Sequence, residues 1–141
     1  MNTHARSAYQ RAEIETLTQR DLLVALFCGM ERGLGQAMAA MNERRIPDSH
    51  DACTRVKAIL VELISSLNAE VGGEIASRLR ELYLFLLSRI AEANLRKDPA
   101  LLAELIPIVA DLRQGWQSVP DEFANVSTVG ANQGHSLNLM S

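Results

Sequence analysis

The chain has 141 residues, a hydrophobic content of 48% and a formal net charge of -3 at pH 7. This length suits a single domain with one hydrophobic core. Only 4% of the residues are aromatic, and glycine and proline are few, so the composition favours a helical protein with an aliphatic core over an all-β fold. The weakly acidic charge gives no support for a nucleic-acid partner, which would require a clustered basic face.

Two cysteines, Cys28 and Cys53, lie within apolar helical patterns. They are too few for a disulfide framework, so we expect buried thiols in a reducing compartment. No apolar run reaches the roughly 18 residues that a membrane span needs. The N-terminal sequence MNTHARSAYQRAE lacks the apolar segment of a secretory signal. We therefore expect a cytosolic protein.

The first 17 residues are polar and follow no steady period. The residues alone leave two interpretations open. The segment is a disordered chain end, or it docks on the domain through its few apolar side chains. These side chains are Tyr9, Ile14 and Leu17.

The first helix is expected to begin near Thr18, because Thr18 and Asp21 have the spacing of a capping box. Apolar residues then recur at helical spacing from Leu23 to Met41. Pro47 interrupts this pattern, which indicates a turn over residues 42–51.

The second helix carries a heptad-like apolar seam from Ala52 to Leu67, and we expect Gly72-Gly73 to end it. Glu74 opens the third helix, which is expected to run to about Lys97.

The third helix is unusually apolar. Its main stripe leaves three further apolar residues outside, namely Leu84, Phe85 and Leu87. A helix that is apolar on most of its circumference is buried, or it needs a partner to cover its second side.

Asp98-Pro99 has the pattern of an N-cap followed by a proline at the first position of a fourth helix, which ends near Trp116. Pro107 lies inside this helix, and we expect a bend there. Four helices with short connections predict an antiparallel four-helix bundle. The domain plan is a segment over residues 1–17, a bundle over 18–117 and a mobile tail over 118–141.

No catalytic or metal-binding pattern stands out. The histidines are His4, His50 and His135, of which two lie in the chain ends and one in a turn. No Glu-x-x-His pair of a di-iron bundle and no nucleophile motif occurs. We expect a protein without catalysis, metal or cofactor.

The order of several residues resembles the flagellar secretion chaperone (FliS) family. The resemblance covers about Tyr9 to Trp116. Its most specific elements are a Gly-Gly-Glu run, a Leu-Tyr pair, an Ala-Asn pair and a terminal tryptophan. In this sequence they are Gly72-Gly73-Glu74, Leu82-Tyr83, Ala93-Asn94 and Trp116.

The resemblance implies a cytoplasmic chaperone without catalysis that binds the C-terminal segment of flagellin one-to-one. It also implies that the protein prevents premature polymerisation of flagellin and helps to deliver it to the flagellar export gate. In this family picture an N-terminal segment covers part of the apolar surface until flagellin displaces it. For this chain the covering residues would be Tyr9, Gln10, Ile14 and Leu17.

The same resemblance predicts a flagellin-binding groove around the third helix. Its residues would be Phe27, Leu82, Tyr83, Leu86 and Asn94. Each apolar member could equally be plain core, and Asn94 could cap a helix locally or bond to the client. Two other functions are open: a chaperone of the same fold for another secreted protein, and a homodimeric bundle that needs no client.

Overall fold

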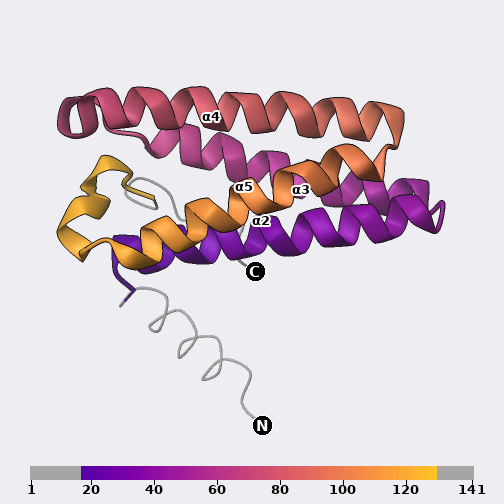
Figure 1. Cartoon of the computed structure of the whole chain (residues 1–141), viewed down its shortest axis with the longest axis horizontal. Coiled ribbons are helices and arrows are strands. Elements are labelled where there is room, and N and C mark those ends of the chain that lie inside the picture. The colour runs from indigo at the N-terminus through magenta and orange to yellow at the C-terminus, as the bar shows by residue number, and fades with distance from the viewer. Residues whose placement is uncertain (1–16, 130–141) are drawn as a thin grey trace, which may run out of the picture.

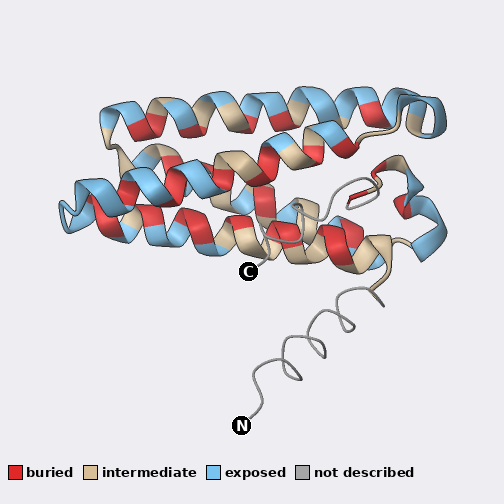
Figure 2. Cartoon of the chain, turned by 180° about the vertical axis from the view of Figure 1, so that it is seen from behind, coloured by how far each residue is buried: buried red, intermediate tan, exposed pale blue. Residues whose placement is uncertain are grey.

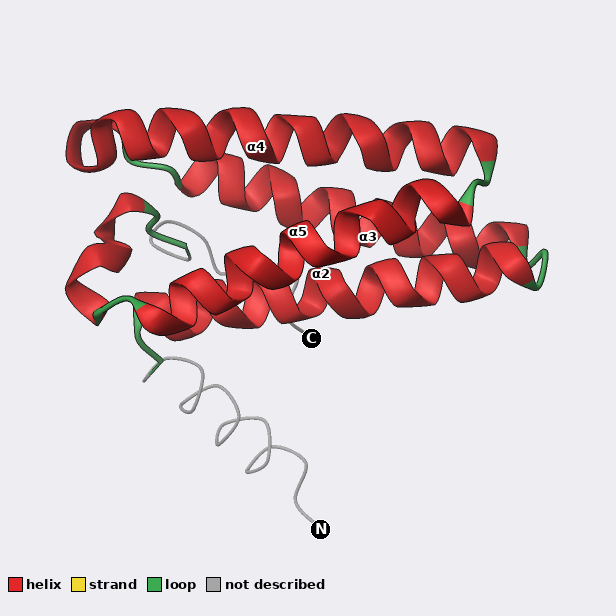
Figure 3. Cartoon of the chain, viewed as in Figure 1, coloured by secondary structure: helices red, strands yellow, loops and turns green. Residues whose placement is uncertain are grey.

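The computed structural model describes residues 17–129. Within these residues the chain forms four long helices, which lie side by side along the length of the molecule (Figure 1). Figure 3 shows that the connections between them are short loops, so successive helices run antiparallel. The predicted all-α four-helix bundle is thereby confirmed. The elements are α2 (Gln19–Asn42), α3 (Ile46–Ser66), α4 (Ala69–Arg96), α5 (Pro99–Ser118) and a 3-10 helix, η1 (Asp121–Val126).

Two helix starts follow the predicted capping chemistry. The Thr18 hydroxyl accepts a hydrogen bond of 3.1 Å from the Asp21 backbone N–H at the start of α2. The Asp98 carboxylate accepts one of 3.0 Å from the Ala100 N–H at the start of α5, and Pro99 follows it in the first turn. Each cap satisfies a backbone donor that has no partner within its helix.

Two helix boundaries differ from the positions predicted from proline and glycine. Pro47 does not lie in the turn between two helices. It lies in the first turn of α3, where its missing N–H costs nothing. The turn between α2 and α3 is therefore only residues 43–45. The glycine pair does not end α3, which already ends at Ser66. Gly73 instead kinks α4 with φ 52° and ψ -121°, and regular helix resumes at Glu74, as predicted.

The core is centred on α2, which packs against both α3 and α5. Figure 2 shows the buried residues as rows on the inward faces of the helices. Gly33 lets α2 and α3 approach closely, because a Cβ atom there would lie 2.5 Å from Val56 Cγ2. The fully buried α2 side chains of this core include Leu23, Phe27, Met30 and Leu34.

The chain after α5 differs from the expected mobile tail. Residues 119–129, here called the C-terminal strap, pack across one end of the bundle. The Asn68 N–H donates to the Val126 carbonyl at 2.8 Å, and the hydroxyls of Ser66 and Ser127 share a buried hydrogen bond. These hydrogen bonds and the buried side chains of Ala124 and Val129 hold the strap. Two isolated apolar residues have no helical period, which is why hydrophobic periodicity did not reveal the strap. Residues 130–141 lie outside the described range.

The structure also bears on two predictions from the sequence, the absence of a membrane span and the burial of the cysteines. None of the described helices is long and apolar enough to cross a membrane. Cys53 is buried, as predicted, whereas Cys28 is only partly buried.

Candidate binding groove

Among the long helices α2 to α5 that pack as neighbours, α4 and α5 make the least extensive contact. At the end near the strap it opens into a hollow of about 510 Å³, here called the α4–α5 groove. The antiparallel course of the two helices brings the first half of α4 beside the second half of α5. The lining residues are Ile75, Leu79, Leu82, Ile108, Asp111, Leu112, Gly115, Trp116 and Val119.

The groove is apolar, and Asp111 is its one charged lining residue. Ile75 at its rim is 61% exposed, and Leu79, Leu82 and Leu112 are only partly buried. Apolar side chains grouped in an open hollow favour binding of another apolar surface over exposure to water. Their arrangement between two helices suits the apolar face of a third helix or an extended chain.

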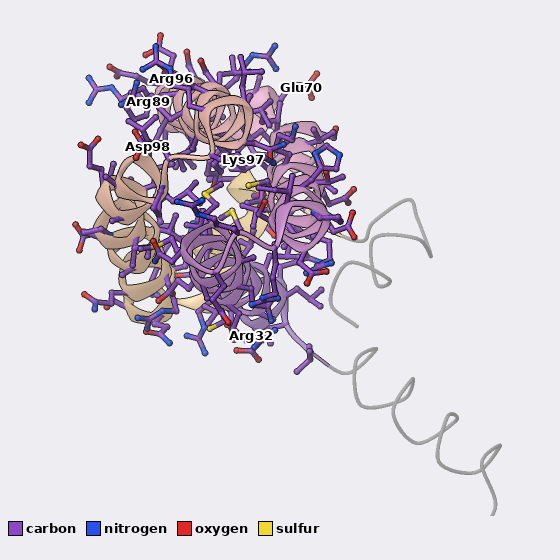
Figure 4. All side chains as sticks on the ribbon, turned by 90° about the vertical axis from the view of Figure 1, so that its right-hand side faces the viewer. Arg32, Glu70, Arg89, Arg96, Lys97 and Asp98 are labelled. Carbon is purple, nitrogen blue, oxygen red and sulfur yellow. The ribbon has the colours of Figure 1, made fainter. Side chains whose placement is uncertain are left out.

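The opposite end of the same seam is closed by charged side chains. Arg89 on α4 pairs with Glu104 on α5 at 3.5 Å and with Glu92 at 2.8 Å. Arg96 also pairs with Glu92, at 3.2 Å. Figure 4 looks along the bundle from this end and shows Arg89 and Arg96 on the same side of α4, with Asp98 where α5 begins. The groove is therefore confined to the strap end.

Of the five predicted groove residues, the structure places only Leu82 in the α4–α5 groove. Phe27, Tyr83 and Leu86 are fully buried in the core, where the Phe27 and Tyr83 ring centroids are 6.3 Å apart. In this conformation a bound chain would touch Leu82 directly but would not touch the other three.

Asn94 lies far from the groove, near the turn between α4 and α5. Its side-chain amide contacts His50 Nδ1 on α3 at 3.1 Å, and its Oδ1 accepts from Lys97 Nζ at 2.6 Å. These contacts give Asn94 a local role in joining α3 to the end of α4. Of the predicted covering segment, Tyr9, Gln10 and Ile14 lie outside the described residues, whereas Leu17 is partly buried next to the start of α2.

The α5 side of the groove was not predicted from the sequence. Ile108, Leu112, Gly115 and Val119 recur at helical spacing beside the core stripe of α5, and this second stripe was the available signal. The sequence indicates further apolar residues on α4 outside its main stripe. Two of these, Leu84 and Phe85, do not line the groove and are 42% and 47% exposed.

Tyr83 is unusual among the core residues next to the groove. Its hydroxyl makes no hydrogen bond with any group in residues 17–129, although the Trp116 indole lies close to it. Burial raises the pKa of this hydroxyl well above its ordinary value, and the neighbouring indole N–H opposes that rise. Within the same range no three His, Cys, Asp or Glu side chains gather into a metal-binding group.

The family model described as "Flagellar protein FliS" matches residues 1–122, which include all four helices and the groove. The chain belongs to the FliS family. This finding confirms the resemblance read from the Gly-Gly-Glu, Leu-Tyr, Ala-Asn and tryptophan elements.

Similar curated proteins carry the names of flagellar secretion chaperones. The Vibrio cholerae flagellar secretion chaperone FliS is 29% identical over 124 residues, which cover 85% of this chain and 91% of that protein. The Pseudomonas aeruginosa flagellar secretion chaperone FliSB is 31% identical over 120 residues, covering 82% and 94%. The Salmonella typhimurium flagellar secretion chaperone FliS is 26% identical over 117 residues, covering 79% and 87%. Membership of this family supports an export-chaperone role in flagellar assembly.

Proposed function

We propose that this FliS family member is a cytosolic export chaperone for flagellin. It binds the C-terminal segment of one flagellin molecule, prevents premature polymerisation and assists delivery of flagellin to the flagellar type III export apparatus. The single observation that carries this proposal is the open apolar groove between α4 and α5 in a chain of the FliS family.

The groove suits a segment that is disordered before it binds. Folding such a segment onto a protein costs about 2–5 kcal/mol or more, which the burial of apolar surface must offset. The groove supplies apolar side chains from both helices, including Leu79 and Leu82 on α4 and Ile108 and Leu112 on α5. An amphipathic helix of the client would place its apolar face against these residues.

Occupation of the groove explains how polymerisation is prevented. The apolar face that a flagellin segment buries here is unavailable for packing against other flagellin molecules. Release at the export apparatus then requires only that the segment leave a groove that is open to solvent along one side.

Calorimetric titration with the C-terminal segment of flagellin from the same organism tests the proposal. We expect saturable one-to-one binding, and Leu82→Glu should weaken it by roughly 100-fold or more because a carboxylate would be desolvated in an apolar groove. Leu95→Glu is the matched control, since Leu95 lies on the same helix, is 85% exposed and does not line the groove. It should bind like the wild-type protein.

Circular dichroism of each variant shows whether the bundle remains folded. Absence of binding by the wild-type protein would overturn the assignment of flagellin as the client. Equal weakening by both leucine variants would overturn the assignment of the α4–α5 groove as the site.

A further inference from the structure

The Tyr83 hydroxyl is a polar group in an apolar environment behind the α4–α5 groove. Tyr83 is fully buried, and no group in residues 17–129 forms a hydrogen bond with its hydroxyl. A buried hydroxyl without a partner is uncommon in folded proteins and costs free energy, because it loses its hydrogen bonds to water. Packing alone would be served equally well by phenylalanine at this position.

The hydroxyl lies next to the groove. Tyr83 follows Leu82, which lines the groove from α4, and the hydroxyl is close to the indole of Trp116, which lines it from α5. Trp116 is 9% exposed and lines the open hollow, whereas Tyr83 is fully buried behind the lining residues. A chain seated between Leu82 and Trp116 would reach the hydroxyl only if the indole moved aside.

The chemistry of the two side chains defines the partner that fits. An indole N–H can only donate a hydrogen bond, so Trp116 cannot accept the hydroxyl proton. The group still required is an acceptor. A backbone carbonyl that is free at the end of a helix, or in an extended stretch of a bound chain, is such an acceptor.

We infer that the Tyr83 hydroxyl is a specificity-determining group that donates a hydrogen bond to a backbone carbonyl of the bound client when the client displaces the Trp116 indole. The inference rests on the proposed function, because it concerns the same groove and the same client. The hydroxyl would thus form in the complex a hydrogen bond that it does not form with residues 17–129 of the free protein.

This role predicts opposite effects of one substitution on two measurements. Tyr83→Phe removes an unpaired hydroxyl from the free protein, so the unfolding temperature of the free protein should rise or stay the same. The same substitution removes the hydrogen bond from the complex, so the Kd for the flagellin C-terminal segment should increase roughly tenfold. A purely structural role for the hydroxyl would not separate the two measurements in this way.

Thermal unfolding and calorimetric titration of wild-type and Tyr83→Phe proteins decide the matter. Equal affinities within twofold would overturn the inference while leaving the proposed function intact. A lower unfolding temperature for Tyr83→Phe would also overturn it, because the hydroxyl would then have a stabilising partner in the free protein. Failure of the wild-type protein to bind the segment would overturn the proposed function, and the inference with it.

Discussion

The two seams of α2 and the seam between α4 and α5 are built differently. The α2–α3 seam is close enough to require Gly33 opposite Val56, and the α2–α5 seam carries the ion pair of Arg113 and Glu31. The α4–α5 seam has ion pairs at one end and an open apolar groove at the other. Under the proposed function, separate helix pairs supply stability and binding, so substitutions should affect the two properties independently.

Charges placed in the two regions give the largest expected contrast. Leu60 is fully buried in α3, and Leu60→Glu should destabilise the bundle by about 4 kcal/mol or more, because a buried carboxylate would have no partner. Leu112→Glu in the groove should leave the helical content near that of the wild type and abolish client binding. Thermal unfolding and titration measure both. If Leu112→Glu unfolds the protein, the groove residues are part of the stabilising core.

A pair of glycine substitutions tests the closeness of the α2–α3 seam. Gly33→Ala should destabilise the protein by about 1–3 kcal/mol, because the new methyl group would overlap Val56. Gly35→Ala is the matched control on the same helix, since a Cβ there meets nothing within 4 Å. It should stabilise the protein by about 0.5–1 kcal/mol through helix propensity. Denaturant unfolding measures both, and equal effects of the two variants would contradict a close seam at Gly33.

The sequence revealed most of the fold because the relevant signals are local. Caps such as Thr18 and Asp98 act on backbone groups two or three residues away, and the apolar stripes required only helical spacing. The strap was missed because the Ser66–Ser127 contact joins residues that are far apart in the sequence.

The site was harder to predict than the fold for a related reason. On a helix as apolar as α4, periodicity does not distinguish the core side of Tyr83 and Leu86 from the groove side of Leu82. That distinction depends on where α5 lies, which is a property of the tertiary structure. The family resemblance predicted Asn94 as a groove residue. Its contacts with His50 and Lys97, which lie away from the groove, became visible only in the folded chain.

Alkaline pH should lower the free energy of unfolding, because two buried core side chains carry protons that can be released. Burial raises the pKa of the Tyr83 hydroxyl and of the Cys53 thiol, so the folded protein holds both protons beyond the pH at which the unfolded chain releases them. The associated stability is therefore fully present below the ordinary thiol and phenol pKa values, about 8.5 and 10, and declines as the pH rises above them.

Unfolding temperatures measured across this alkaline range test the expectation. Tyr83→Phe should lose less stability above about pH 10 than the wild-type protein, because the substituted ring has no proton to release. Identical declines for the two proteins would show that Tyr83 does not remain protonated inside the folded bundle.

The ion pairs at the closed end of the α4–α5 seam should have the smallest effect. Glu104 is mostly exposed, and Arg89 keeps its contact with Glu92 when Glu104 is neutralised. Glu104→Gln should therefore change the free energy of unfolding by no more than about 0.5 kcal/mol and leave client affinity unchanged. A larger loss, measured by denaturant unfolding, would mean that these charges hold the seam together.

Amide hydrogen exchange of the full chain, alone and saturated with the flagellin C-terminal segment, tests most directly whether the client occupies the α4–α5 groove. If the client occupies the groove, exchange in the bound state should be slower over residues 75–82 of α4 and 108–119 of α5, with the turn between α2 and α3 at residues 43–45 unchanged. Slower exchange confined to the α2–α3 turn or to the outer face of α3, with no change along the groove, would contradict it.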